Sequence, residues 1–376
     1  MKKKIFILAG EKSGDLLGSK VIRNLDKRKF KIRGVGGELM ENEGLESIFP
    51  LRDISVMGFF ELLPKLFKIL ARSRLIVREI IKFQPDILLT IDSPDFCFRI
   101  AKKIKKFDKN NKIRKIHLVA PTVWAYREGR AKKISKIYDK LLCLFPFEPP
   151  YFEKYGLKTK FVGHPLFYQD SEYEFDLKKI DRGARSNIIV ITAGSREGEV
   201  RRLLPIILNV VERLRKQRND LKYYFLATND TFPLLKDKIG EDGDIKIVKE
   251  KEIIGKALLG IAKSGTNALE FGGFLTPCVT CYRFSPLTNL LVGAMRAVAK
   301  NKFANIANVM AEKEIVPEFV LGNCRADKIC EGVVKLLDSE AERETQRREV
   351  KKILWRLGYE SRVFSSKSLA EEVINE

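Results

Sequence analysis

Short apolar runs alternate with longer, charged segments of helical period along nearly the whole chain. An apolar run of about four to eight residues is typical of a buried strand, and the charged segments have the spacing of amphipathic helices. Strands separated by helices form right-handed βαβ crossovers, which build parallel sheets covered on both faces. The pattern therefore predicts an α/β fold with parallel sheets.

The predicted strands fall into two sets, separated by a polar, charged stretch at 169–186. The first set comprises 5–9, 32–35, 87–91, 116–120, 141–145 and 160–162, and the second comprises 188–192, 223–227, 245–248, 258–262 and 277–282. We predict an N-terminal Rossmann-like domain over 1–168 and a C-terminal one over 187–337. The helical tail, 338–376, could pack back on the N-terminal domain. Ligands of open α/β sheets bind outside the carboxyl ends of the strands, so the strand-end loops should carry the chemistry.

The chain is strongly basic, because 71 lysines and arginines stand against 49 aspartates and glutamates, a net charge of +22. Such a surface attracts nucleic acid, anionic phospholipid or phosphorylated substrates. The basic residues are scattered and no nucleic-acid-binding motif is present, so we expect no nucleic-acid partner. The six cysteines show no paired framework, and Cys278 and Cys281 lie in a strand-like run. We interpret them as reduced, buried thiols of a cytoplasmic protein, and expect no metal and no cofactor.

Two loops of the second set suit a nucleotide diphosphate-sugar. Ser264, Gly265 and Thr266 offer hydroxyls and backbone N–H groups where a helix should begin, and a helix N-terminus attracts phosphate. Glu270, one turn further, can accept hydrogen bonds from sugar hydroxyls. An ordinary Ser/Thr N-cap with a first-turn glutamate explains the same residues. After the strand at 188–192 come Gly194, Ser195 and Arg196; the arginine can clamp a diphosphate or form a surface salt bridge.

The loops of the first set carry carboxylates and aromatic residues. Glu11, Ser13 and Asp15 follow the first strand, without the G-x-G-x-x-G or P-loop pattern. Asp92 and Asp95 follow the third strand, and one of them could be a general base, while capping of the next helix is the alternative. Trp124 and Arg127 share the loop after the fourth strand, where an aromatic ring beside cations suits a sugar or a phosphate.

Taken together, these segments resemble the lipid A disaccharide synthases, a family of glycosyltransferases in Gram-negative outer-membrane biogenesis. The resemblance covers almost the whole chain. It is carried by GEKSGDLLG (10–18), GVGGELMENEG (34–44), DISVMGFFELLPKL (53–66), PDILLTIDSPDF (85–96), APTVWAYREGR (120–130), LFPFEPPYFEKYG (144–156), FVGHPL (161–166), GSREGEVRRLLP (194–205), KSGTNALE (263–270) and YRFSPLT (282–288).

The resemblance implies an inverting, metal-independent transferase of GT-B architecture, with two Rossmann-like domains facing a central cleft. It implies UDP-2,3-diacylglucosamine as donor, 2,3-diacylglucosamine 1-phosphate (lipid X) as acceptor, and a β-1,6-linked tetraacyl disaccharide 1-phosphate and UDP as products. Asp92 would be the catalytic base, and Glu11, the second catalytic residue, would lie in an acceptor-side loop. The residues implied in UDP binding are Gly194, Ser195, Arg196, Ser264, Gly265, Thr266, Glu270 and Asn308. Ala307 stands before Asn308, where the family has proline.

Acylated substrates imply work at a bilayer surface, so we expect the protein to associate peripherally with the anionic inner membrane. The basic amphipathic stretch at 56–69 is the candidate contact, through Phe59, Phe60, Leu63, Lys65, Leu66, Phe67 and Lys68. The alternative, packing against a sheet, is favoured for residues 70–83. The family includes homodimers, but the sequence specifies no interface. The closest rival activities are those of another GT-B UDP-GlcNAc transferase and of a UDP-sugar epimerase.

Overall fold

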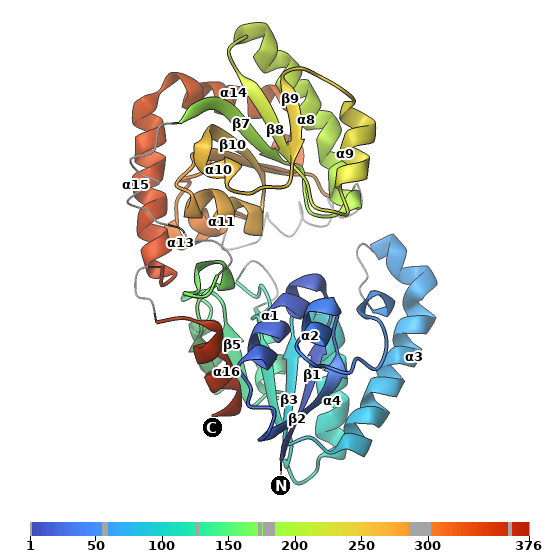
Figure 1. Ribbon diagram of the computed structural model, residues 1–376. Helices are drawn as coiled ribbons and strands as arrows, with labels where there is room; N and C mark the ends of the chain where they lie inside the picture. The colour runs from blue at the N-terminus through green and yellow to red at the C-terminus, as the bar shows by residue number, and fades with distance from the viewer. Residues whose placement is uncertain are drawn as a thin grey trace. The chain divides into compact units, whose positions relative to one another are not determined.

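The computed structural model describes residues 2–54, 59–124, 128–171, 175, 185–285, 302–359 and 363–375, apart from the side chains of 59–66 and of Thr266. The chain divides into two compact units. Unit 1 comprises Met1–Glu172 and Leu357–Glu376, and unit 2 comprises Tyr173–Arg356. Within the described residues, each unit is built around one six-stranded parallel sheet flanked by helices (Figure 1). The predicted α/β class is thereby confirmed.

The sheet of unit 1 has the strand order β2-β1-β3-β4-β5-β6. Its strands are β1 (Lys3–Ala9), β2 (Phe30–Val35), β3 (Ile87–Ile91), β4 (Arg114–Leu118), β5 (Lys140–Cys143) and β6 (Lys158–Phe161). Its helices are α1 (Lys12–Arg23), α2 (Glu38–Asn42), α3 (Phe59–Phe83), α4 (Pro94–Phe107), α5 (Gly129–Ser135), α6 (Pro150–Glu153) and α16 (Ser366–Ile374), with 3-10 turns at Leu51–Asp53 and Pro165–Phe167.

Alternate residues of the strands in unit 1 supply two separate cores, because successive side chains of a strand point to opposite faces. Ile5 and Ile7 pack with α1 and α16 on one face of the sheet. Phe6 and Leu8 pack with residues of α3 and α4 on the other face. These two helices are labelled beside the sheet in Figure 1. The helices on both faces explain why the strands read as nearly continuous apolar runs.

The sheet of unit 2 has the strand order β12-β11-β10-β7-β8-β9. Its strands are β7 (Ser186–Thr192), β8 (Lys222–Leu226), β9 (Ile245–Val248), β10 (Ala257–Lys263), β11 (Cys278–Tyr282) and β12 (Glu318–Val320). Its helices are α8 (Glu197–Gln217), α9 (Phe232–Ile239), α10 (Ile253–Lys256), α11 (Thr266–Gly273), α13 (Ile306–Ala311), α14 (Ala326–Asp338) and α15 (Glu340–Arg356), with a 3-10 turn at Leu321–Asn323. The short edge strand β12 was not predicted from the sequence.

The last helix of the chain belongs to unit 1, although α15 immediately before it belongs to unit 2. On α16, Leu369 and Val373 are fully buried in the core that α1 covers. The buried Lys140 ammonium donates to both the carbonyl oxygen and the carboxylate of Glu372, at 2.8 and 2.7 Å. The C-terminal residues thus complete the fold of the N-terminal half.

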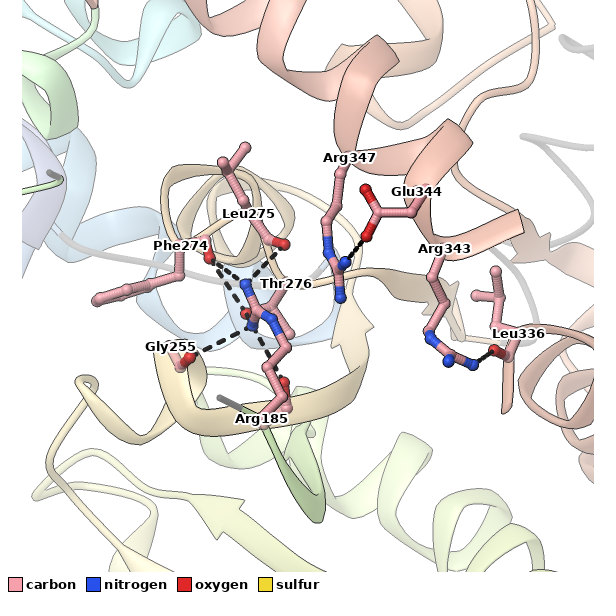
Figure 2. A network of polar contacts seen from close by, with 10 residues as sticks. Arg185, Gly255, Phe274, Leu275, Thr276, Leu336, Arg343, Glu344 and Arg347 are labelled. Carbon is pink, nitrogen blue, oxygen red and sulfur yellow. Dashed lines mark hydrogen bonds and ion pairs between the residues drawn. The ribbon is translucent and has the colours of Figure 1, made fainter. Parts of the chain in front are cut away.

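Arg185, just before β7, anchors the start of unit 2 (Figure 2). Its guanidinium donates to the carbonyl oxygens of Gly255, Phe274 and Leu275 at 3.0–3.3 Å and to Oγ1 of Thr276 at 2.7 Å. These carbonyls lie at the ends of α10 and α11, where the last carbonyl groups lack partners within the helix and a cation is favourable. Arg185 thereby fixes the C-terminal end of α11, whose other end lies at the candidate site.

All six cysteines are buried. Cys278 and Cys281 lie within β11, and burial raises the pKa of both thiols. This confirms their interpretation as small residues of the core. In the part of the chain that the structure describes, no helix combines the length and the apolar character needed to cross a bilayer.

Candidate functional site

Four side chains meet at the carboxyl ends of β1 and β3, and we call this group the acidic edge: Glu11, Ser13, Asp92 and Ser93. The Ser13 hydroxyl donates to Oδ2 of Asp92 at 2.6 Å, and the Ser93 backbone N–H donates to Oδ1 at 2.8 Å. The Ser93 hydroxyl donates to Oε1 of Glu11 at 3.2 Å. Both oxygens of the half-buried Asp92 carboxylate are therefore oriented, which suits a group that must accept a proton from one direction.

The backbone at the acidic edge is strained. Asp92 and Ser93 have φ values of 56° and 40°, and Val119, at the end of the neighbouring β4, has a φ of 80°. A left-handed conformation costs about 1–3 kcal/mol for each residue that carries a side chain, and such strain concentrates at functional sites. Gly10 permits this geometry, because a Cβ there would lie 2.3 Å from Cβ of Ser93.

Neither candidate carboxylate acts as the N-cap of α4. Ser93 occupies the N-cap position, and among the described residues its side chain makes no capping hydrogen bond. Asp95 is exposed and pairs at 2.6 Å with Arg130, whose guanidinium lies over the ring of Phe98. The structure therefore separates the two aspartates: Asp92 joins the acidic edge, whereas Asp95 pairs with a cation outside it.

The other candidates of unit 1 have different surroundings. Asp15 is buried, and its carboxylate accepts the backbone N–H groups of Gly37, Leu39 and Met40 at the start of α2. Trp124 is also buried and packs edge-on against Phe147, with ring centroids 5.4 Å apart. Asp15 thus holds the loop after β2, and Trp124 presents no open ring face as a platform.

Arg127, the remaining candidate of unit 1, lies outside the described residues.

Sequence reasoning missed Glu148, which follows β5 and is only 2% exposed. Burial raises its pKa to about 8, although the N–H of Phe145 donates to its carboxylate at 3.0 Å. Burial also lowers the pKa of His117 to about 3 and that of His164 to about 4, so both imidazoles are neutral near pH 7. The sequence does contain a signal for Glu148: it is a glutamate in an aromatic and proline-rich run, directly after a buried strand.

At the carboxyl edge of the second sheet, β7 leads into Gly194, Ser195 and Arg196. Gly194 has a φ of 127°, and a Cβ there would lie 2.7 Å from Cβ of Glu199. Arg196 is half-buried at the N-cap position of α8, and its Nη1 lies 3.7 Å from Oε1 of Glu199. Arg196 therefore lies at the end of this loop, where α8 begins, and the neighbouring Ser195 is exposed.

Next to this loop, β10 leads into Ser264, Gly265 and α11. Gly265, with a φ of 119°, occupies the N-cap position, so the helix does not begin with a Ser or Thr cap. Ser264 is buried, and its backbone N–H donates to the carbonyl oxygen of Cys281. The first N–H groups of a helix have no partner within it and favour an anion. This geometry favours the phosphate-binding interpretation over the capping one.

Two further candidates already have protein partners. Oε1 of Glu270 accepts from the Lys251 ammonium at 2.6 Å, and Oε2 accepts from the Asn267 amide at 3.2 Å. Asn308 is fully buried, and its amide bonds to the backbone of the segment 315–316. Glu270 thus lies oriented in the second turn of α11, whereas Asn308 shapes the loop that follows α13.

Lys263 is a second residue that sequence reasoning passed over. Its ammonium lies 3.0 Å from Oε1 of Glu199 and 5.0 Å from the centroid of the Tyr282 ring. A Cβ at Gly265 would lie 3.7 Å from the same nitrogen. We call Arg196, Glu199, Lys263 and Gly265 the basic edge of unit 2.

Of the candidate membrane residues, Phe67 is 84% exposed on α3. Lys68 pairs at 2.6 Å with Asp53, which Arg72 also contacts. The Lys68 ammonium, and to a smaller extent Arg72, lower the pKa of the Asp53 carboxyl despite its burial. The side chains of Phe59, Phe60, Leu63, Lys65 and Leu66 lie outside the described part of the structure.

The fold of the chain is similar to that of several solved structures. MurG of Acinetobacter baumannii has a TM-score of 0.61 at 12% identity, with 100% of each chain covered. The UDP-GlcNAc 2-epimerase of Neisseria meningitidis, bound to UDP-GlcNAc, has a TM-score of 0.60 at 13% identity and covers 94% of this chain and 99% of its own. At such identities the likeness shows the fold alone. The fold is that of the GT-B class of glycosyltransferases and related epimerases.

Residues 5–373 match the model of the family described as lipid-A-disaccharide synthetase. The lipid-A-disaccharide synthase of Rickettsia bellii (strain OSU 85-389) is 38% identical over 384 aligned positions, which span 100% of this chain and 99% of the relative. That of Rickettsia prowazekii (strain Madrid E) is 38% identical over 369 positions, which span 96% and 95%. The chain therefore belongs to the lipid-A-disaccharide synthase family, and it is a glycosyltransferase of lipid A biosynthesis.

Proposed function

We propose that the protein transfers the sugar of UDP-2,3-diacylglucosamine to the 6-hydroxyl of 2,3-diacylglucosamine 1-phosphate. The products are a β-1,6-linked tetraacyl disaccharide 1-phosphate and UDP. The observation that carries the proposal is the placement of Asp92, held in a strained backbone at a strand end by the Ser13 hydroxyl and the Ser93 N–H. Family membership supplies the substrate class, and the acidic edge supplies the base that the acceptor hydroxyl requires.

In the proposed reaction, the Asp92 carboxylate takes the proton from the acceptor's 6-hydroxyl. The hydroxyl oxygen forms a bond to the anomeric carbon of the donor while the bond from that carbon to the UDP oxygen breaks on the opposite face, so the configuration inverts. A positioned general base contributes about 10²–10⁴-fold to the rate. Glu11 acts beside Asp92 as the second carboxylate of the acidic edge, since it accepts a hydrogen bond from the hydroxyl of Ser93, the residue that follows Asp92.

The charge that develops on UDP requires stabilisation, which we assign to unit 2. Arg196 neutralises the diphosphate, and the backbone N–H groups at Gly265–Thr266 donate to it from the N-terminus of α11. The loops of Gly194, Ser195 and Ser264 allow the phosphates to approach the backbone closely.

Glu270 accepts hydrogen bonds from the ribose hydroxyls, since a carboxylate held by Lys251 and Asn267 keeps further lone pairs. Asn308 acts indirectly, through the segment 315–316.

The acceptor side of the proposal uses the remaining loops of unit 1. Charged side chains for the acceptor's 1-phosphate and hydroxyls come from Asp95 and its partner Arg130, and from Arg127, which precedes Arg130 in the sequence. Trp124 supports this loop from within, because it packs against Phe147.

Both substrates carry acyl chains, and we propose that residues 59–68 contact an anionic inner-membrane surface from which these lipids are drawn. The exposed Phe67 beside Lys68 supports this contact, because an apolar ring next to a cation suits the boundary between headgroups and acyl chains. Sedimentation with vesicles tests it: the protein should prefer anionic over neutral vesicles, and equal binding to both would refute the contact.

The activity is tested by incubating the protein with the two acylated glucosamine substrates and analysing the products by mass spectrometry. We expect a tetraacyl disaccharide 1-phosphate and an equal amount of UDP. The same incubation with unacylated UDP-GlcNAc distinguishes the rivals. Formation of an epimerised UDP-sugar, or transfer of an unacylated sugar in preference to the acylated one, would show that the protein catalyses one of the rival reactions and not the proposed one.

A further inference from the structure

Lys263 is the last residue of β10, directly before the Ser264–Gly265 turn. Its ammonium lies close to Gly265, because a Cβ built at that glycine would be 3.7 Å from Nζ. Gly265 is the N-cap residue of α11. A lysine ammonium is therefore held beside the helix N-terminus that we assign to the diphosphate.

Two neighbours fix this ammonium in place. Glu199, in the first turn of α8, is only 7% exposed, and its Oε1 lies 3.0 Å from Nζ of Lys263. The ring of Tyr282 lies under the ammonium at 5.0 Å, a cation–π distance. Burial raises the pKa of Tyr282, and the nearby Glu199 carboxylate raises it further. The Lys263 ammonium thus lies between the buried Glu199 carboxylate and the ring of Tyr282.

Glu199 also connects the two loops of the basic edge. Oε1 of Glu199 lies 3.7 Å from Nη1 of Arg196, so one oxygen faces both cations. Oε2 is buried and has no hydrogen-bond partner among the described residues. Two cations therefore lie against one buried carboxylate at the ends of two adjacent strands.

We propose that Lys263 binds the diphosphate of the donor directly, and that Glu199 and Tyr282 are positioning residues that hold its ammonium beside Gly265. This inference rests on the proposed function and adds a second cation to the leaving-group site. Lys263 complements Arg196, because the two cations come from adjacent strand ends and can reach different phosphate oxygens.

The simpler alternative is that Lys263 only neutralises the buried Glu199. The two roles predict different UDP affinities for a variant in which Lys263 and Glu199 are both substituted. If Lys263 is a counter-ion, removal of the carboxylate removes the need for it. If Lys263 binds phosphate, removal of the carboxylate cannot replace the missing ammonium.

Isothermal titration with UDP at one fixed salt concentration tests the proposal on the full chain. The Lys263→Met variant should bind UDP about 10-fold more weakly or worse, as expected for the loss of a charge-assisted contact. The Lys263→Met/Glu199→Gln double variant should remain weakened by at least about fivefold, because no buried carboxylate is then left unpaired while the phosphate contact of the ammonium is still missing. Lys256→Met, at an exposed lysine of the same unit, serves as the control and should match the unmodified protein.

Two results would overturn the inference while the proposed function stands: UDP affinity of Lys263→Met within about twofold of the unmodified protein, or full recovery of affinity in the double variant. If the unmodified protein itself fails to bind UDP, the proposed function falls, and this inference falls with it. Circular dichroism of each variant shows whether a loss of affinity reflects loss of fold. Should the single variant unfold, the double variant decides the question.

Discussion

The acidic edge of unit 1 and the basic edge of unit 2 occupy equivalent positions, at the carboxyl ends of parallel strands, but their chemistry is opposite. In unit 1, hydroxyl and backbone donors orient a carboxylate. In unit 2, a buried carboxylate lies against two cations beside a helix N-terminus. One type of sheet thus presents an oriented carboxylate in one unit and two cations beside a helix N-terminus in the other.

The backbones of the two edges differ in a way that follows from this chemistry. In unit 2 the left-handed positions are taken by Gly194 and Gly265, which adopt positive φ without a steric penalty. In unit 1 they are taken by Asp92, Ser93 and Val119, which carry side chains. Glycine lets a ligand approach the backbone N–H groups closely, as the proposed anion site requires, whereas the proposed base requires a side-chain carboxylate. The strained positions of unit 1 thus coincide with the side chain to which we assign the function.

The largest expected effect is that of Asp92→Asn, which removes the proposed proton acceptor while keeping the shape of the side chain. We expect turnover to fall by about 10²–10⁴-fold. Asp95→Asn is the matched comparison, since Asp95 is exposed and paired with Arg130. Product formation under saturating substrates is the measurement. A larger loss in Asp95→Asn than in Asp92→Asn would move the base to the other aspartate.

The next largest effect should come from Arg196→Ala, which removes one cation from the basic edge. We expect kcat/KM to fall by about 10²-fold, the usual cost of losing one stabiliser of a developing negative charge. Arg201→Ala is the control, because Arg201 lies on the exposed side of α8 and pairs only with Glu197 among the described residues. Steady-state kinetics with both variants is the measurement, and equal losses would show that Arg196 has no special role.

A smaller effect is expected from Ser13→Ala, which deletes the 2.6 Å hydrogen bond to Asp92. Loss of a hydrogen bond to a charged group should slow turnover by about 10-fold, with the fold unchanged. Ser19→Ala on the same helix is the control, because the Ser19 hydroxyl donates to the carbonyl oxygen of Leu16 within α1. Turnover and the melting temperature are measured together. Unchanged turnover in Ser13→Ala would show that Asp92 needs no orientation.

The last effect concerns stability rather than rate, and it involves the buried Glu148 in the loop after β5. Its pKa is raised by burial to about 8, so the folded protein binds the proton more tightly than the unfolded chain. Stability from this group is full below the unfolded pKa of about 4.5 and falls as the pH rises towards 8, by up to about 1.4 kcal/mol per pH unit.

Urea unfolding between pH 6.5 and 8 measures this slope. The buried His117 and His164 add an opposite slope near the lower end of this range, because their unfolded imidazoles titrate at about pH 6.5, but the unmodified protein and a Glu148 variant share that contribution. The Glu148→Gln variant should lose the slope, because its side chain does not titrate. The same slope in both proteins would show that Glu148 is ionised in the folded state.

Much of the fold could be predicted because apolar periodicity reports burial directly. Each of the eleven predicted strands overlaps a strand of the structure, whereas β12 was missed. This strand has only three residues, Glu318–Val320, which is too short to show a period, and it follows a proline. It forms because β11 offers an open edge, and such pairing is invisible in local sequence.

The candidate site could be predicted only in part. Asp92 and Arg196 stand at strand ends, where the sequence pattern points to function. Lys263 was passed over, because a lysine at the end of a strand is most often solvated and nothing local indicates that Glu199 will lie beside it. Asp15 was grouped with Ser13 by proximity in sequence, yet its side chain points to the start of α2. Such pairings depend on tertiary contacts.

The central claim is that proton removal belongs to the acidic edge and diphosphate binding to the basic edge. Calorimetric titration of UDP into the Asp92→Asn and Arg196→Ala variants, side by side with the unmodified protein, tests this division most directly. The account predicts that Asp92→Asn keeps the UDP affinity of the unmodified protein within about twofold, while Arg196→Ala binds UDP about 10-fold more weakly. Weakened UDP binding in Asp92→Asn, or unchanged binding in Arg196→Ala, would contradict it.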